Sequence, residues 1–338
     1  MWSWLSKIAS ACLGPVRRYA RTRKDEDGGD NGRVVDDLLW SRDLGRHAAG
    51  EFSFAVAQAN EVLEDHSQVE TGGAATFVGV YDGHGGAEAA RFISEHLFAH
   101  LVRLAQENGT ISEDVVRSAF SATEEGFLTL VRRTHFIKPM IAAVGSCCLV
   151  GVIWRGTLYV ANLGDSRAVV GSLGRSNKIV AEPLTRDHNA CMEEVRQELI
   201  SRHPDDSEIV VLKHGVLAHQ GHNSDTMAHV DLQCMIRSTL IWKLLDLFLP
   251  ILMRLGVAKR LVRAALKQSA RKREMRYDDL KKVEKGVRRF FHDDITVVVV
   301  YIDHELVQGR DTKAPELSVR GFVDSVGTSR FSGLSALS

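Results

Sequence analysis

The feature that most constrains this chain is a set of short β-rich runs that arrive in groups separate from the helical stretches. Runs of β-branched and aromatic residues occupy Thr76–Tyr81 (TFVGVY), Gly145–Trp154 (GSCCLVGVIW), Thr157–Ala161 (TLYVA) and Ile295–Ile302 (ITVVVVYI). Apolar residues recur at helical spacing over Ala87–Gln106 and Ser112–Arg133. Because hairpins and helices are grouped instead of alternating, we expect an α+β fold of antiparallel sheets with helices on their faces.

Composition and charge exclude several classes of protein. The 338 residues are 44% hydrophobic, and 43 basic side chains balance 43 acidic ones, so disorder throughout is excluded and no net field favours nucleic acid. The cysteines are sparse and show no zinc-like spacing, and adjacent Cys147 and Cys148 in an apolar run are typical of small buried thiols. We therefore expect an intracellular protein, in the cytoplasm, the nucleus or both, that is a monomer and binds no nucleic acid.

The sequence divides into three parts. Residues 1–33 hold an apolar stretch with two tryptophans and a basic end, followed by a polar, glycine-rich linker. This segment is typical of peripheral contact with a membrane surface, of a helix docked on its own domain, or of a frayed terminus. Residues 34–305 form the expected domain, and we expect the Ser/Gly-rich tail, 306–338, to be disordered.

Acidic residues recur where predicted strands begin or end. They are Glu64 and Asp65, Asp82 in DGHGG, Asp165 in GDSR, and Asp293 with Asp294. Each alone is also explained as a turn, a solvated loop or a strand cap. Together, carboxylates on one rim of a sheet predict a site for Mg²⁺ or Mn²⁺, which prefer oxygen ligands. Two such ions can activate a water and neutralise a phosphate.

Two neighbours of Asp82 fit that chemistry. Gly83 has no Cβ, so its backbone carbonyl can approach a metal closely. His84 lies two residues from Asp82 and can protonate a leaving oxygen.

Five sequence motifs, and the order in which they occur along the chain, resemble those of the protein phosphatase 2C family, the metal-dependent serine/threonine phosphatases. The resemblance is strongest to the plant members of the family. The matching segments are VLEDHSQ (62–68), FVGVYDGHGG (77–86), LYVANLGDSRAVV (158–170), LTRDHNA (184–190) and HDDITVVVV (292–300). The resemblance implies two antiparallel sheets packed face to face and flanked by helices. It also implies hydrolysis of phosphoserine and phosphothreonine in phosphoprotein substrates, with two Mg²⁺ or Mn²⁺ ions at one rim.

The resemblance also implies a role for each site residue. Asp82 bridges the two metals, Gly83 contributes its carbonyl, and Asp293 is the terminal metal aspartate. Glu64 and Asp65 bind metal-coordinated water. The resemblance further implies that His84 is the general acid and that Asp165 is a ligand of an accessory third metal.

The chain departs from the family pattern at two places. The family usually carries a phosphate-holding arginine four residues before the Glu64 position, where this chain has Asn60. Residues 215–255 replace a longer stretch that supplies a further metal aspartate, so the fold is expected to be incomplete in its third quarter. Asp225 is a weak substitute for that aspartate, because no glycine follows it and no strand-like run precedes it.

The replacement leaves three hypotheses open. The chain is a working phosphatase, a catalytically impaired relative that binds phosphoproteins, or a fragment without function. Leu240–Leu255 is almost wholly apolar, and as a helix it would extend about 24 Å, short of the roughly 30 Å core of a membrane. A helix that covers the core is the favoured interpretation, and an exposed apolar patch is the alternative. The basic stretch 271–289 is typical of a solvated helix face, a nuclear import signal or a surface for an acidic partner.

Overall fold

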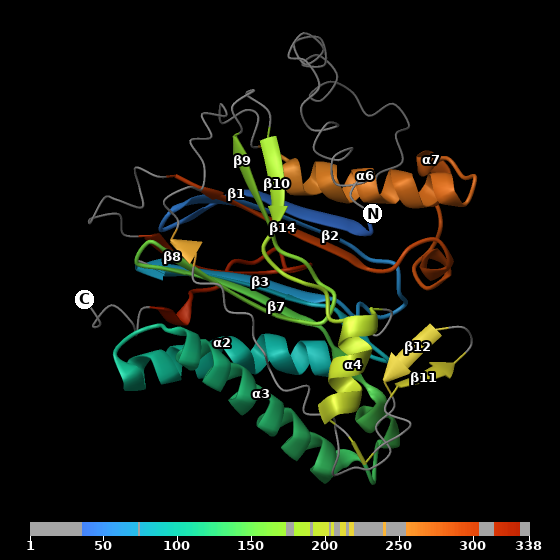
Figure 1. Cartoon of the computed structure of the whole chain (residues 1–338). Helices are drawn as coiled ribbons and strands as arrows, with labels where there is room; N and C mark the ends of the chain where they lie inside the picture. Colours follow the sequence, from blue (N-terminus) through green and yellow to red (C-terminus); the bar gives the residue numbers. More distant parts are fainter. Residues whose placement is uncertain are drawn as a thin grey trace.

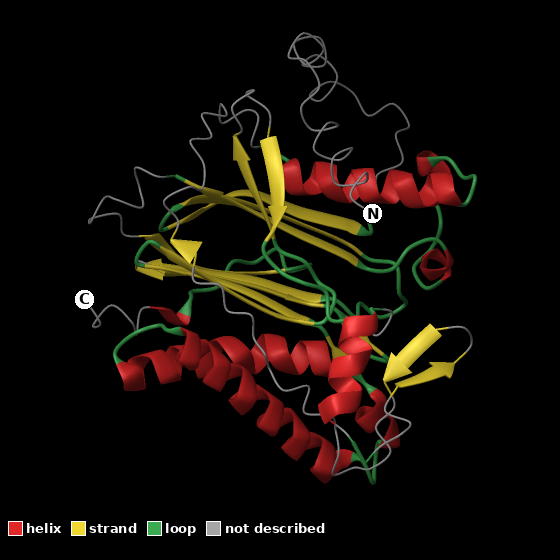
Figure 2. Cartoon of the chain, viewed as in Figure 1, coloured by secondary structure: helices red, strands yellow, loops and turns green. Residues whose placement is uncertain are grey.

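The β-rich runs form two antiparallel sheets that lie face to face, with helices on both outer faces (Figures 1 and 2). This architecture comes from a computed structural model, which describes residues 36–73, 75–173, 179–189, 192–202, 204–205, 210–213, 216–219, 239–240, 255–303 and 314–331. The predicted α+β fold is confirmed.

The first sheet has three strands in the order β1-β2-β14. They are β1 (Leu39–His47), β2 (Gly50–Ala57) and β14 (Ile295–Ile302). Helix α6 (Val257–Lys272) packs on the outer face of this sheet. The helix buries one side chain per turn, at Ala258, Val262, Leu266 and Ala270. That four-residue spacing gives it a single apolar stripe against Ala55 and Ala57 of β2.

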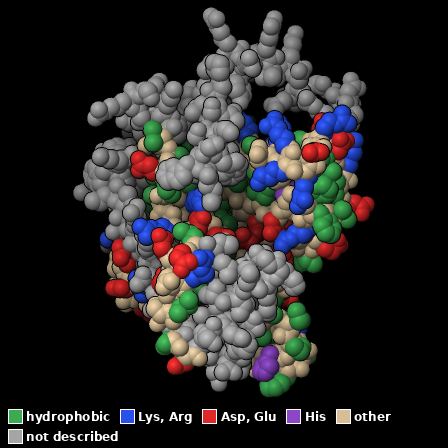
Figure 3. Space-filling model, turned by 45° about the vertical axis from the view of Figure 1, so that its right-hand side comes forward, with side chains coloured by type: hydrophobic (Ala, Val, Ile, Leu, Met, Phe, Trp, Pro, Cys, Tyr) green, Lys and Arg blue, Asp and Glu red, His purple; other side chains and the backbone are tan. Residues whose placement is uncertain are grey.

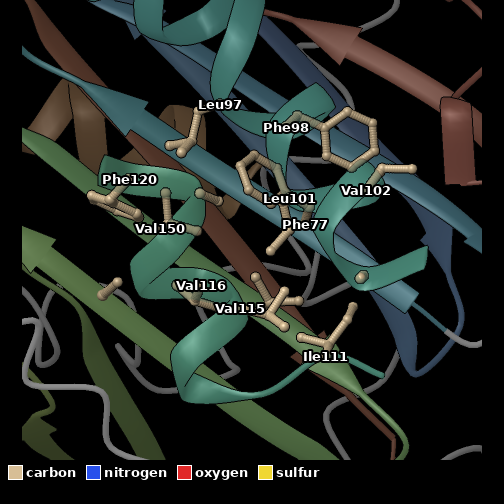
Figure 4. Close-up of a cluster of buried hydrophobic side chains, with 14 of the residues drawn as sticks. Phe77, Leu97, Phe98, Leu101, Val102, Ile111, Val115, Val116, Phe120 and Val150 are labelled. Carbon is tan, nitrogen blue, oxygen red and sulfur yellow. The ribbon is translucent and has the colours of Figure 1, made fainter. Parts of the chain in front are cut away.

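The second sheet has six strands in the order β13-β8-β7-β4-β3-β15. They are β3 (His66–Gly73), β4 (Ala75–Tyr81), β7 (Cys148–Trp154), β8 (Thr157–Leu163), β13 (Thr239–Leu240) and β15 (Ala314–Arg320). Helices α2 (Glu88–Asn108) and α3 (Glu113–Thr134) cover its outer face. Leu97, Phe98 and Leu101 of α2 meet Phe77 and Val150 of the sheet in the largest apolar cluster (Figure 4).

Smaller elements surround the two sheets. The short strands β5 (Gly83–His84) and β6 (Gly145–Ser146) pair with each other, as do β9 (Val169–Leu173) with β10 (Ile179–Pro183) and β11 (Val210–Lys213) with β12 (Val216–His219). The remaining helices are η3 (Pro139–Ala143), α4 (Glu193–Arg202), α7 (Tyr277–Leu280) and η5 (Val287–Phe290).

The local signals that predicted the β7–β8 hairpin and α3 have clear structural counterparts. Arg155 and Gly156 both have positive φ, 47° and 75°, as a type I′ turn requires. Ser112 caps α3, because its side chain accepts a hydrogen bond from the Val115 amide. The helices predicted over 87–106 and 112–133 are confirmed to within two residues at each end.

The predicted disordered tail, 306–338, is wrong for residues 314–331. Strand β15 pairs with β3 along one edge of the six-stranded sheet. Beyond it, Phe331 is 1% exposed and its ring packs edge-on against Phe98. The folded domain therefore extends past the boundary at 305. The Ser/Gly-rich composition predicted disorder because it did not indicate that Phe331 would pack into the core.

Part of the replacement segment 215–255 does join the fold. Strand β13 pairs with β8 at the other edge of the six-stranded sheet, Thr239 opposite Leu158 and Leu240 opposite Thr157. Asp225, the rest of the apolar run and residues 1–33 lie outside the described residues. Among the helices that the structure describes, none has the length and apolar character needed to cross a membrane.

Candidate metal centre and active site

The acidic motifs of the sequence meet at one rim of the two sheets. Asp82 follows β4, Asp165 follows β8, and Asp293 and Asp294 precede β14. Figure 3 shows acidic side chains gathered in a hollow at the centre of one face, beside several basic ones. The ends of strands from both sheets therefore bring these carboxylates to the same rim.

The tightest group of possible metal ligands is formed by Asp82, Cys147 and Asp165. One side-chain ligand atom from each lies within 4.8 Å of the other two. The Cys147 thiol donates to Oδ1 of Asp165 at 3.4 Å, and Asn189 Nδ2 donates to Oδ2 of Asp165 at 3.0 Å. The backbone is fixed as well, because the Cys147 amide donates to the Asp82 carbonyl at 2.9 Å.

Cys147 differs from the expectation for a buried thiol. Cys148 is 3% exposed and belongs to the core, but Cys147 is only partly buried and faces the carboxylates. Successive residues of an extended chain point to opposite sides, so two adjacent cysteines cannot both enter the same core. Burial and the nearby carboxylates raise the pKa of the Cys147 thiol to about 12, so it is protonated in the absence of a metal.

Gly83 is required by close packing of the backbone. A Cβ at this position would lie 2.6 Å from the backbone oxygen of Glu64, well inside the normal contact distance. The DGHGG turn therefore closes directly against the loop that carries Glu64 and Asp65. His84 is exposed, and its residue pairs with Gly145 across the short β5–β6 ladder. That ladder holds the imidazole at the rim.

Asp294 organises the loop opposite the metal ligands. Its Oδ1 accepts hydrogen bonds from the amides of Ala59 (2.7 Å) and Asn60 (3.1 Å), and its Oδ2 accepts one from the Glu64 amide (2.9 Å). The resemblance implied a metal-binding role for Asp293 and gave no role to Asp294. The backbone contacts show that Asp294 has a structural role, whereas Asp293 is more exposed and faces the site.

Asn60 lies among the carboxylates instead of standing free to bind a ligand. Its Nδ2 is 3.0 Å from Glu64 Oε2, 3.2 Å from Asp294 Oδ2 and 3.3 Å from Asp293 Oδ1. Arg289, which the motifs did not indicate, forms an ion pair with Asp293 and lies 3.9 Å from Glu64 Oε2.

The electrostatics of the rim favour a cation. Burial, and then repulsion from Asp293 and Asp165, raises the pKa of Asp82 to about 6. Burial raises the pKa of Asp65 to about 8, although a hydrogen bond from Thr296 (2.6 Å) partly opposes the shift. The pKa of Glu64 is also raised, chiefly by burial. Crowded carboxylates of this kind fit a hard divalent cation, because its charge removes the cost of keeping them ionised.

The structure brings most of the predicted site residues together. Asp82 and Asp165 lie within ligand distance of each other, and the loop carrying Glu64 and Asp65 is held against Gly83 and Asp294. The sequence interpretation gave Asp294 no separate role, treated Cys147 only as a buried thiol, and did not assign Arg289 to the site. Alternation along the strand could have identified Cys147. The amides that Asp294 contacts, and Glu64 beside Arg289, are too distant in sequence to be anticipated.

Comparison with known proteins gives the family. The protein phosphatase 2C model matches residues 42–196. A rice protein named probable protein phosphatase 2C 25 is 67% identical over 387 positions that cover 100% of both chains. The chain belongs to the protein phosphatase 2C family. An Arabidopsis thaliana member, probable protein phosphatase 2C 68, is 54% identical. The alignment covers 98% of this chain and 99% of the Arabidopsis protein. The chain is therefore, by family, a plant-type protein serine/threonine phosphatase.

Two further comparisons concern structure and length. A crystal structure of a Mycobacterium tuberculosis serine/threonine phosphatase is similar, with a TM-score of 0.46 and 17% identity, over 75% of this chain and 99% of that one. The alignment with the rice phosphatase spans 387 positions against 338 residues here, a difference of 49. This chain therefore has fewer residues than the aligned length shared with the rice relative. Neither plant relative is named as an inactive protein, so the impaired-relative hypothesis has no support from them.

Proposed function

We propose that the chain hydrolyses phosphoserine and phosphothreonine in proteins, with Mg²⁺ or Mn²⁺ bound at the rim. The observation that carries this proposal is the group of carboxylates around Asp82. Asp82 and Asp165 follow different strands and, together with the Cys147 thiol, their ligand atoms lie within 4.8 Å of one another. Burial, and then repulsion from Asp293 and Asp165, raises the pKa of Asp82 to about 6. Family membership supports the same chemistry.

Asp82, the Gly83 carbonyl and Asp293 would hold the principal metal, and Asp165 would hold an accessory one. Bound ions of this kind activate water and neutralise the charge of a phosphate. Glu64 and Asp65 would orient water through their carboxylates. The hydrogen bond from Thr296 to Asp65 supports this role, because it limits the movement of that carboxyl group. His84 is exposed on the β5–β6 ladder, where it can give a proton to the departing serine or threonine oxygen.

The metal aspartate of the family stretch that residues 215–255 replace would affect the affinity for the second metal ion. A second ion would rely on Asp82 and on water, and water cannot replace a missing negative charge. We infer that one metal binds measurably and the other only weakly, so turnover should be low and steeply dependent on metal concentration.

Partners and location follow from the same reasoning. The substrate is a phosphoprotein, and we infer a monomer in the cytoplasm or nucleus. The N-terminal segment 1–33 offers peripheral contact with a membrane. Fractionation of plant cells that express the full chain, beside a chain without residues 1–33, tests this contact. Equal distribution of the two proteins would contradict it.

The test of function is hydrolysis of matched peptides that carry phosphothreonine, phosphoserine or phosphotyrosine. With millimolar Mn²⁺ we expect orthophosphate release from the first two, with phosphotyrosine at least about tenfold slower. Chelation should stop the reaction, and Asp82→Asn should show no metal-dependent turnover. Hydrolysis that survives in Asp82→Asn, or that prefers phosphotyrosine, would contradict the proposal.

A further inference from the structure

A basic side chain lies inside the acidic rim. The guanidinium of Arg289 forms an ion pair with Asp293 and lies 3.9 Å from Glu64, yet its side chain remains 48% exposed. It also counteracts the mutual repulsion of the carboxylates, since it lowers the pKa of both Glu64 and Asp82 against the larger effect of burial.

The short helix η5 explains why this arginine faces the site. Arg288, the residue of η5 that precedes Arg289, is fully buried. It forms an ion pair with Asp36 at 2.8 Å and donates a hydrogen bond to His292 at 3.0 Å. Arg288 thereby anchors η5 to the start of the first sheet. With that anchor in place, the next residue, Arg289, is directed outward to the rim.

A phosphate that approaches this rim needs a positive partner. A substrate phosphate carries up to two negative charges, and the carboxylates of Glu64, Asp82 and Asp293 repel it. Asn60 cannot supply the attraction, because its amide is neutral and its Nδ2 already contacts three carboxylates. Arg289 has five N–H donors, more than its two carboxylate partners require.

We propose that Arg289 binds the phosphate group of the substrate in this chain, in place of an arginine at position 60. The proposal rests on the proposed phosphatase function and adds the residue that recognises the phosphate. In this structure the guanidinium pairs with Asp293. With a cation bound to that carboxylate, donors of Arg289 would be free to bind phosphate oxygens, in the planar, charged geometry that favours arginine.

A purely structural role for Arg289 makes a different prediction. If Arg289 only held Asp293 in place, removing it would weaken metal binding, and phosphate affinity would fall as a consequence. If Arg289 binds phosphate, its removal also removes a cation that competes for Asp293. Metal affinity should then stay the same or increase while phosphate affinity falls.

The experiment is calorimetric titration of the full chain with Mn²⁺, and then of the Mn²⁺-loaded protein with orthophosphate. The variants are Arg289→Ala, Arg289→Lys, and Arg289→Ala combined with Asn60→Arg. Arg276→Ala is the matched control, because Arg276 is exposed and pairs with Asp279. We expect Arg289→Ala to weaken orthophosphate binding at least about tenfold without weakening Mn²⁺ binding. The orthophosphate affinity of Arg289→Lys should lie between those of the unaltered protein and Arg289→Ala. Adding Asn60→Arg to Arg289→Ala should restore orthophosphate affinity.

Each other outcome has a definite meaning. Unchanged orthophosphate affinity in Arg289→Ala overturns the proposal, and so does a parallel loss of Mn²⁺ affinity or the absence of orthophosphate binding by the unaltered protein. Steady-state kinetics give a second readout, since the loss should appear mainly in KM. If orthophosphate binds through Arg289 but no phosphopeptide is hydrolysed, the proposed function fails and the phosphate site stands.

Discussion

At the residue scale, the adjacent aspartates 293 and 294 have separate tasks. Asp293 faces the rim and the guanidinium of Arg289, whereas Asp294 turns back and accepts hydrogen bonds from four backbone amides of the loop 59–65. The charge on Asp294 strengthens these bonds, because hydrogen bonds to an ionised acceptor are stronger than neutral ones. The loop that carries Glu64 and Asp65 therefore depends on a residue that holds no metal itself.

Asp294→Ala should destabilise the fold and disturb the site. Removing the acceptor leaves amides of the loop without partners, and we expect the free energy of unfolding to fall by about 2–4 kcal/mol. Urea denaturation measures this, with the exposed Asp278→Ala as the control. A loss no larger than that of the control would show that the loop is held by other contacts.

The site residues themselves could be predicted only in part. Asp82, Asp165 and Asp293 were found because each adjoins a recognisable strand, and strand ends meet at a rim. Arg289 was not found, because its position depends on Arg288 pairing with Asp36, some 250 residues earlier. The close approach of Gly83 to the Glu64 carbonyl is likewise a product of tertiary packing.

At the element scale, the polar strand β3 was not predicted from the sequence. Strand β3 reads HSQVETGG, yet Gln68, Glu70 and Thr71 are all buried, because the strand lies between β4 and β15. Several of its polar atoms have partners inside the fold: Ser318 Oγ is 2.8 Å from Glu70, and Thr71 Oγ1 donates to the Pro315 carbonyl at 2.5 Å. A hydrophobic pattern identifies strands such as β4 and β14, but it does not identify a strand whose core face is polar.

The C-terminal anchor offers a test of the corrected boundary. Phe331→Ala should lower the free energy of unfolding by about 3–5 kcal/mol, because it removes a fully buried aromatic from its place against Phe98. Thermal or urea unfolding checks the value, and Phe290→Ala, at a position 75% exposed, is the control. Equal effects in the two variants would mean that residues 314–331 contribute little to the core.

His47 joins the two sheets and should make their association sensitive to pH. Its Nε2 donates to the Tyr301 carbonyl of β14 at 3.0 Å, and Nδ1 contacts Thr76 of β4 at 3.1 Å. Nδ1 also accepts a hydrogen bond from the Ala49 amide, so protonation at Nδ1 would remove an acceptor. Burial lowers the pKa of His47 to about 4.

The sign of the effect follows from that depressed pKa. The unfolded chain takes up the proton near its ordinary pKa of about 6.5 and the folded protein only near 4, so stability is lost as pH falls between these values. The contribution is at most about 3 kcal/mol. Melting temperatures of His47→Gln should be lower at pH 7 but should change less between pH 7 and 4.5. Parallel pH profiles for the variant and the unaltered protein would exclude His47 as the cause.

At the scale of the whole molecule, the candidate centre draws on both sheets. Asp82 and Asp165 follow strands of the six-stranded sheet, whereas Asp293 precedes β14 of the three-stranded one. A cation held by all of them would connect the two layers where their strands converge. Because a ligand that binds only the folded state stabilises it, Mn²⁺ should also raise the melting temperature.

The central claim is that the carboxylates around Asp82 bind a divalent cation, and calorimetric titration with Mn²⁺ tests it most directly. We predict one measurable site, with a second that fills only near millimolar Mn²⁺. Asp82→Asn should weaken Mn²⁺ binding at the measurable site by at least about a hundredfold. Even residues that only hydrogen-bond to a metal ligand contribute about 10–100-fold to metal affinity. Equal Mn²⁺ binding by Asp82→Asn and the unaltered protein would contradict the account. Two tight sites of similar affinity would contradict the inferred loss of a ligand and direct attention to Asp225.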